Sequence, residues 1–241
     1  MPDNFQLYLT CFFYTCSIHT IINGNFAEIL HEGVTMNEQL SIGSIISNGL
    51  SYGFKNILNL LGAIVLWVLT IWIPYLNIGT TIGLIGLVVH MSKGEPFSPT
   101  VIFDAKYRKN FGEFFLLCGF MWMGIYFASM LLIIPGIVLQ VAWGQSLYLF
   151  LDKGIKPLSA LRKSNDITYG KKWSIFLGEF ILMAIVGIIF VIVVAIFSKI
   201  PFLSGLFTFI GIIFIIAIAM GVKAYIYSVL SKDVEPETET V

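Results

Sequence analysis

Glu179 is the residue whose type and position most clearly suggest chemistry. It lies six residues after Trp173, within a run that stays apolar to about Ala195. An ionisable group inside a long apolar helix is costly to keep there, and such groups commonly relay protons or cations. The competing interpretation is a carboxylate close to lipid headgroups, satisfied by Lys171, Lys172, water or a neighbouring helix.

Gln140 and Gln145 are the other polar candidates in apolar sequence. They are five residues apart and therefore lie on different faces of a helix. Such residues can line a path for a solute, although hydrogen bonding between helices is their commoner role.

The chemistry expected of enzymes and metalloproteins is missing from the sequence. His90 has no Cys, His or carboxylate at metal-ligand spacing, so no metal site is predicted. The chain also lacks a Ser-His-Asp set, a phosphate-binding glycine loop and paired carboxylates within one apolar run. We therefore predict no catalytic residues, no cofactor and no enzymatic activity.

The composition identifies the solvent that these residues occupy. The 241 residues are 57% hydrophobic and 12% charged, whereas a soluble domain carries about 25% charged residues. So few charges cannot cover a water-exposed surface, so lipid must surround much of the chain. The formal net charge is zero, which leaves no overall basic field to attract nucleic acid.

Three long apolar segments predict the membrane spans. Residues 56–92 and 114–151 contain no charged residue, and each run is about twice the roughly 20 residues that one crossing needs. Pro74 and Pro135 interrupt them near the middle, where a reversal is expected. A third hairpin is formed by residues 173–195, Pro201 and residues 207–227. The predicted fold is an all-α integral membrane protein with about six spans, although residues 136–151 are short and could be re-entrant.

The three hairpins are expected to be copies of one internal repeat. The turns all contain Ile-Pro, at Pro74, Pro135 and Pro201, and the exits read SKGEP, DKGIKP and SKDVEP. The period is about sixty residues, which gives repeats over about 40–92, 97–152 and 157–231 in one domain, residues 36–232.

An interfacial amphipathic helix is predicted before each hairpin. In residues 42–54 the apolar side chains recur on one helical face. Ser98 and Pro99 are suited to begin the second helix, and Pro157 the third, with Gly170 as its stop. Simple connecting loops are the alternative to helices of this kind, which suit a bilayer surface.

The basic residues predict the orientation. Most of the fourteen Lys and Arg residues fall at hairpin bases: Lys55, Lys93, Lys106, Arg108, Lys109, Lys153, Lys156, Arg162, Lys163, Lys171, Lys172 and Lys232. Lys199 lies at a hairpin tip, and Lys223 is expected to extend its long side chain toward the basic side. The positive-inside rule then places the bases and the C-terminus in the cytoplasm. Arg162, Lys163, Lys171 and Lys172 are the expected contacts for anionic lipid.

The two ends of the chain do not follow the repeat. Residues 1–35 lack the basic segment of a signal peptide, and the first Lys or Arg is Lys55. We hypothesise that Met36 is the physiological start and that residues 1–35 are an extension; a seventh span there is the alternative. Residues 233–241 are expected to form an acidic tail.

The stretch IPGI from Ile134 through Asp152, followed by PLSALRKS from Pro157 and by Thr168, Gly170 and Trp173, carries a family resemblance. It resembles uncharacterised bacterial integral membrane proteins related to the membrane domain of glycerophosphoryl diester phosphodiesterases. The resemblance implies a multi-pass protein of the bacterial inner membrane. It implies no catalysis, because no polar segment here is long enough to hold the hydrolase domain.

These observations favour a membrane scaffold or accessory protein that interacts with lipids, with partner proteins or with a second copy of itself. The alternative is a small-molecule or ion transporter or channel, since internal repeats are common in transporters. A transporter requires a water-accessible cavity containing Glu179 or the glutamines. A scaffold requires those residues to be packed or near the headgroups, with Arg162 and Lys163 carrying the interaction.

Overall fold

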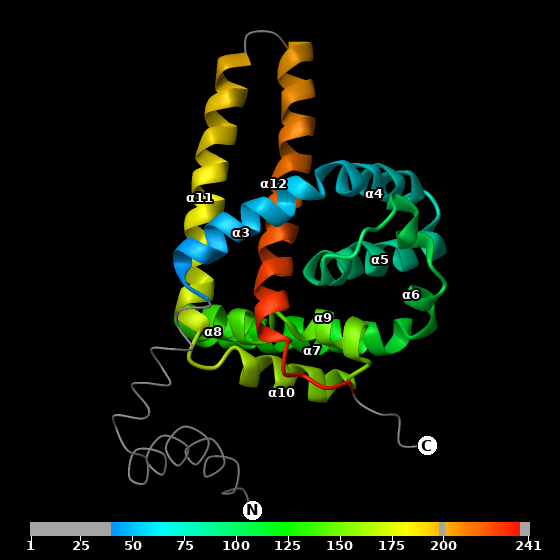
Figure 1. The fold of residues 1–241 in the computed structure, drawn as a ribbon, viewed down its shortest axis with the longest axis vertical. Coiled ribbons are helices and arrows are strands. Elements are labelled where there is room, and N and C mark those ends of the chain that lie inside the picture. Colours follow the sequence, from blue (N-terminus) through cyan, green and yellow to red (C-terminus); the bar gives the residue numbers. More distant parts are fainter. Residues whose placement is uncertain (1–39, 198–200, 237–241) are drawn as a thin grey trace, which may run out of the picture. The chain divides into compact units, whose positions relative to one another are not determined.

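The computed structural model describes residues 40–197 and 201–236, and these residues form helices and no strand. The predictions made for the extension 1–35, its alternative seventh span, the start at Met36, Lys199 and the last five residues of the acidic tail lie outside the described residues. The helices, labelled as in Figure 1, are α3 (Ile42–Lys55), α4 (Ile57–Thr70), α5 (Pro74–Lys93), η1 (Pro99–Phe103), α6 (Lys106–Lys109), α7 (Phe111–Leu131), α8 (Ile133–Trp143), α9 (Ser146–Lys153), α10 (Pro157–Ile167), α11 (Lys172–Phe197) and α12 (Pro201–Leu230).

Proline and glycine set several of the helix ends where the sequence predicts them. Pro74 and Pro157 begin α5 and α10, where a missing backbone N–H has no cost. Gly94, Gly154 and Gly170 all have positive φ, between 65° and 75°, a conformation that glycine adopts without strain. The second reversal differs from the prediction: it occurs at the extended residue Leu132, and Pro135 lies in the first turn of α8.

Five helical segments are long and apolar enough to cross a membrane, and a sixth depends on a bend. The sixth would combine α3 with α4, which meet at 66°. With 14 residues, α4 measures about 21 Å against a hydrocarbon core of about 30 Å. The short segment predicted at 136–151 begins earlier, at Ile133, and reaches a spanning length through Lys153 with a break between α8 and α9.

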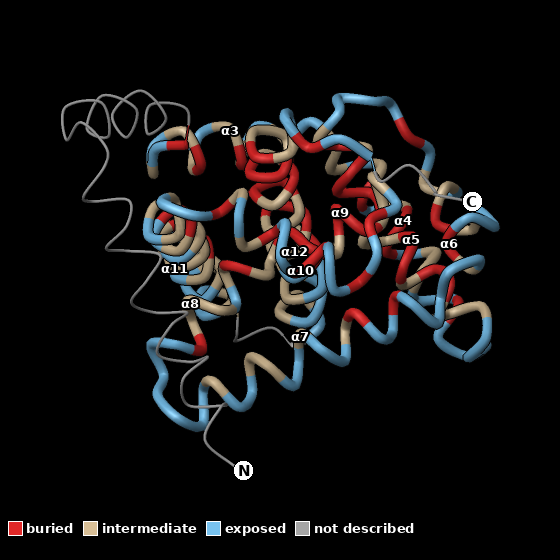
Figure 2. Tube along the Cα trace, turned by 90° about the horizontal axis from the view of Figure 1, so that it is seen from below, coloured by how far each residue is buried: buried red, intermediate tan, exposed pale blue. Residues whose placement is uncertain are grey.

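The predicted bundle of three hairpins is not confirmed. Consecutive long helices do pack together, α4 on α5, α7 on α8 and α11 on α12. However, α11 and α12 lie side by side in one direction, while α7 and α8 run across them in both views (Figures 1 and 2). The hairpin topology and its threefold repeat therefore stay predictions.

The predicted interfacial helix at 42–54 is present as α3, but its inner face packs on protein. Ile45 is fully buried, and its side chain fills the space above Gly178 of α11. Gly49 and Gly53 cross α12 at Gly221 so closely that a Cβ on Gly221 would lie 2.5 Å from the Gly49 carbonyl oxygen. Small residues allow such a crossing because no side chain separates the two backbones.

The second predicted interfacial helix is replaced by η1 and α6, which pack along α5. Glycines 79, 83 and 86 of α5 form the seam: their Cβ positions are occupied by the Arg108 side chain, the Ile102 backbone and the Tyr107 ring. Gly79 lies only five residues after Pro74, where the first hairpin reverses. Because Arg108 packs against Gly79, the segment that connects α5 to α7 is not confined to the base of the first hairpin.

Apolar side chains dominate the exposed surface of the longest helices. Trp122, Met130 and Leu131 of α7 and Ile188 and Val191 of α11 are all more than half exposed, and both helices are coloured mainly as intermediate or exposed in Figure 2. Water would not tolerate so large an apolar surface. The described helices therefore have the length and the surface of a multi-pass membrane protein.

Candidate functional site

Glu179 pairs with Lys223 across the α11–α12 interface. The Lys223 Nζ donates to both carboxylate oxygens, at 2.7 Å and 2.8 Å. Each residue lies seven positions from the base end of its helix, a depth of about 10 Å. The side chains are 24% exposed for Glu179 and 34% for Lys223, so the pair is partly open on one side.

The sequence offered Lys171, Lys172, water or a neighbouring helix as the partner of Glu179, and in the structure the partner is a side chain of the neighbouring helix α12. Lys223 was predicted only to extend toward the basic side, so sequence reasoning missed the pair. A signal for it exists: Glu179 precedes Pro201 by 22 residues and Lys223 follows it by 22. Two antiparallel helices that reverse at Pro201 place these residues at the same height.

Gln140 joins this site and Gln145 does not. A cavity of about 200 Å³ is lined by Gln140, Glu179 and Lys223 together with apolar residues of α8 and α11. A neighbouring cavity of about 190 Å³ shares Ile137, Val141 and Phe176 with it and extends to Lys172 and Trp173. The exposed Gln140 carboxamide has no hydrogen bond within the described chain. The arrangement can accept an additional polar group.

Gln145 lies in the break between α8 and α9 and is 1% exposed. Its side-chain Oε1 is buried with no hydrogen-bond partner in the described part of the chain. Its backbone N–H donates to the Ser164 Oγ at 3.2 Å, and that hydroxyl donates to the Ala142 carbonyl at 2.6 Å. Ser164 thus satisfies backbone groups that the break releases.

The predicted lipid contacts lie together on the outer face of α10 and the start of α11. Arg162 and Lys163 are exposed, with no ion-pair partner among residues 40–197 and 201–236. The opposite face of α10 is buried against α8 and α9 through Ala160, Leu161 and Ser164. Lys171 is half-buried, and Lys172 donates to the Asn165 Oδ1 at 2.7 Å. Tyr169 and Trp173 beside these cations are 73% and 64% exposed.

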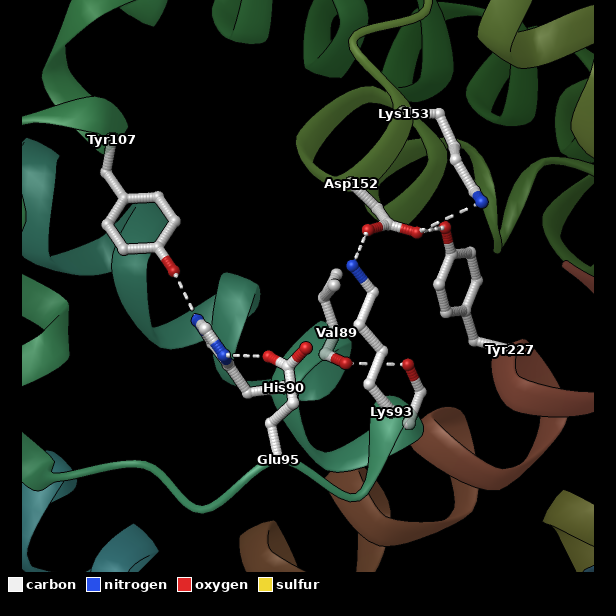
Figure 3. A network of polar contacts seen from close by, with 9 residues as sticks. Val89, His90, Lys93, Glu95, Tyr107, Asp152, Lys153 and Tyr227 are labelled. Carbon is white, nitrogen blue, oxygen red and sulfur yellow. Dashed lines mark hydrogen bonds and ion pairs between the residues drawn. The ribbon is translucent and has the colours of Figure 1, made fainter. Parts of the chain in front are cut away.

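A polar chain at the end of α5 was not predicted (Figure 3). The His90 Nδ1 lies 3.1 Å from the Glu95 Oε2, and its Nε2 lies 3.4 Å from the Tyr107 hydroxyl. Sequence reasoning considered His90 only for metal-ligand spacing, whereas the turn at Gly94 brings the Glu95 carboxylate back to it. Burial, with a smaller contribution from the Asp104 charge, raises the pKa of Tyr107 to about 12.

A second polar cluster joins three helix ends at Asp152, whose side chain is 3% exposed. Its Oδ1 lies 2.5 Å from the Lys93 Nζ at the end of α5, and its Oδ2 accepts a 2.8 Å hydrogen bond from Tyr227 of α12. Lys153 lies 4.0 Å away (Figure 3). These groups neutralise a buried carboxylate, so the arrangement is one of packing and holds no open site.

Neither cluster has the composition of a metal centre, since no group of three His, Cys, Asp or Glu residues gathers anywhere in the described ranges. Comparisons with protein-family models, with curated proteins and with solved structures return no match. The resemblance to phosphodiesterase-associated membrane proteins therefore stays a prediction.

Proposed function

We propose that this protein is a non-catalytic accessory protein of the bacterial inner membrane that binds anionic lipid through its cytoplasmic face. The binding surface is the α10 basic patch, defined as Arg162, Lys163, Tyr169, Lys171 and Trp173. Bound lipid would let the protein organise its surroundings as a scaffold, for partner proteins or for further copies of itself. The C-terminus lies on the same side, as the distribution of basic residues predicts.

One observation carries this proposal: α10 buries one face on protein and presents two unpaired cations on the other. An anionic membrane surface attracts each such cation by about 1 kcal/mol. Tyr169 and Trp173 add aromatic rings beside the cations, and such rings favour the headgroup region. Cations and aromatic rings together match the chemistry of an anionic headgroup.

The test is lipid retention by the purified protein. Wild type and the variant Arg162→Gln/Lys163→Gln are reconstituted in nanodiscs of phosphatidylglycerol and phosphatidylcholine, and the lipids that remain after mild detergent stripping are counted by native mass spectrometry. The variant should lose about thirtyfold in preferential retention of phosphatidylglycerol, since two contacts of about 1 kcal/mol each are removed.

The matched control is Lys106→Gln/Lys109→Gln, which removes the same charge from α6. It should retain phosphatidylglycerol as wild type does. Equal retention by wild type and by the α10 variant would refute the proposal. Equal losses in the α10 and α6 variants would also refute it, because the attraction would then come from total charge.

A transporter is the second candidate, and the cavity beside Glu179 favours it. The cavity contains a carboxylate, an ammonium group and a carboxamide, which a polar solute could contact. If the protein transports such a solute, Glu179→Gln should reduce flux into proteoliposomes at least tenfold while the melting temperature of the protein changes little. Unchanged flux, or no flux by wild type across a panel of ions and metabolites, would leave the accessory function.

A further inference from the structure

The Glu179–Lys223 pair and Gln140 present polar surface to a cavity whose other walls are apolar. Roughly a quarter of the Glu179 side chain and a third of the Lys223 side chain are exposed. The Gln140 carboxamide is exposed beside them with no partner in the described part of the chain. Hydrocarbon cannot satisfy such groups, and leaving them unsatisfied is costly. The occupant of the cavity must therefore bring polar atoms.

The charge of the site restricts which polar group fits. One carboxylate and one ammonium group give a site of zero net charge, which offers a purely anionic headgroup no net attraction. A headgroup with its own ammonium and phosphate matches both charges, because the phosphate meets Lys223 while the ammonium meets Glu179. Gln140 can donate a further hydrogen bond to the phosphate.

The apolar walls of the cavity continue along α11. Met183 lines the polar cavity, and a second cavity of about 270 Å³ begins at Val186 and is lined only by apolar residues and glycine of α11 and α12. Along α11 the lining residues recur every three or four positions, at Glu179, Met183, Val186, Phe190 and Val193. Residues at this spacing share one face of a helix. From Glu179 to Val193 this face is about 21 Å long, more than one leaflet of about 15 Å.

We propose that Glu179, Lys223 and Gln140 bind one phospholipid with a zwitterionic ethanolamine headgroup, whose acyl chain lies along α11 between Met183 and Val193. The headgroup is at the base and the chain points toward the hairpin tip, which is the orientation of a lipid in the leaflet on the basic side. The site is distinct from the α10 basic patch and does not depend on the function proposed above.

The experiment uses the full chain in nanodiscs of equal phosphatidylethanolamine and phosphatidylglycerol. Lipids retained after mild detergent stripping are identified by native mass spectrometry. Wild type should retain one phosphatidylethanolamine in about tenfold preference over phosphatidylglycerol. Glu179→Gln leaves Lys223 without its counter-ion, so this variant should reverse the preference toward phosphatidylglycerol. A pair that only joined α11 to α12 would change stability and leave lipid preference unaltered.

A matched pair of variants tests the chain-binding part with the ion pair intact. Val193→Phe fills the apolar cavity, whereas Val191→Phe adds the same ring on an exposed face two residues away. Val193→Phe should lose the retained phosphatidylethanolamine about tenfold, while Val191→Phe retains it. Melting temperatures of the two variants check that both are folded.

Three outcomes would overturn the inference. One is equal retention of the two phospholipids by wild type. Another is equal retention by Val193→Phe and Val191→Phe. The third is a water-soluble metabolite, and no phospholipid, bound in a manner that depends on Glu179. Arg162→Gln/Lys163→Gln should keep the bound phosphatidylethanolamine, so failure of the α10 patch and failure of this site are distinguishable.

Discussion

The hydroxyl of Tyr227 on α12 donates a 2.8 Å hydrogen bond to Asp152 at the end of α9. Both side chains are almost fully buried, and Lys93 from the end of α5 completes the carboxylate's partners. Three helix ends that are far apart in the chain therefore meet at one charge. Because a buried carboxylate is tolerated only when it is paired, this cluster constrains how α5, α9 and α12 can pack.

The first prediction removes that charge. Asp152→Asn keeps an acceptor for Tyr227 and leaves Lys93 without a counter-ion, so it should lower the free energy of unfolding by about 2 kcal/mol. Thermal unfolding in detergent, followed by tryptophan fluorescence, measures the loss. Asp104→Asn is the control, because that carboxylate is 46% exposed and lies 3.7 Å from Lys106; it should change stability by less than about 0.5 kcal/mol at neutral pH. Equal losses of unfolding free energy in the two variants would contradict the prediction that the buried Asp152 cluster stabilises the fold more than an exposed ion pair does.

The second prediction concerns the crossing of α3 and α12 at Gly221. A methyl group there would collide with the Gly49 carbonyl oxygen and the Gly53 backbone, so Gly221→Ala should destabilise the protein by about 2 kcal/mol. Gly187→Ala on α11 has nothing within 4 Å of its Cβ and should be neutral or slightly stabilising. A Gly221→Ala variant that melts at the temperature of wild type would show that the two backbones are further apart.

Individual helix ends could be predicted from the sequence, whereas contacts between helices largely could not. Pro157, Gly154 and Gly170 act locally, through a missing N–H or a positive φ, so their types alone indicate where α9 and α10 end or begin. Long apolar runs likewise indicate spans because lipid requires them. Charge patterns were less reliable: Arg108 was predicted at a hairpin base and packs against Gly79.

At the candidate site, too, the residues could be predicted from local sequence, whereas the contacts between helices could not. Glu179 and Gln140 were identified because a polar residue is conspicuous in apolar sequence, and the structure places both at one cavity. Gln145 was identified on the same ground and lies instead in the break between α8 and α9, which no local pattern revealed. The partners of Lys223 and Asp152 were missed because they come from other helices: Glu179 is 44 residues from Lys223, and Tyr227 is 75 residues from Asp152.

The third prediction uses the raised pKa of Tyr107. Between its ordinary value of 10 and about 12, the folded protein keeps a phenol proton that the unfolded chain has lost. Folding is then linked to proton uptake, so stability falls as pH rises through this window, by up to about 1.4 kcal/mol per pH unit. Tyr107→Phe should remove that part of the slope in melting experiments between pH 9 and about 12.

Asp104→Asn provides the internal check on this titration. Its charge contributes the smaller part of the rise in the Tyr107 pKa. The variant should therefore lower the pKa of Tyr107 in the folded protein, so that the pH range over which stability falls ends at a lower pH. His90, 3.4 Å from the phenol, and Lys106, 4.9 Å from the ring centroid, remain in place. A slope that is identical in wild type and Tyr107→Phe would contradict the assignment.

The fourth prediction tests how the break between α8 and α9 is held. Ser164 accepts from the Gln145 N–H and donates to the Ala142 carbonyl, and it is fully buried. Ser164→Ala removes both hydrogen bonds. The Ala142 carbonyl keeps a longer contact from the Thr168 hydroxyl, at 3.5 Å, whereas the Gln145 N–H loses its partner in a site with no access to water. The variant should therefore lose about 2 kcal/mol in unfolding free energy. Ser159→Ala, on the exposed face of the same helix, should have almost no effect. Hydrogen exchange of the Gln145 amide gives a local readout: it should become faster in Ser164→Ala and stay slow in Ser159→Ala. Slow exchange in both variants would mean that another group satisfies the break and that α10 is held by its apolar contacts.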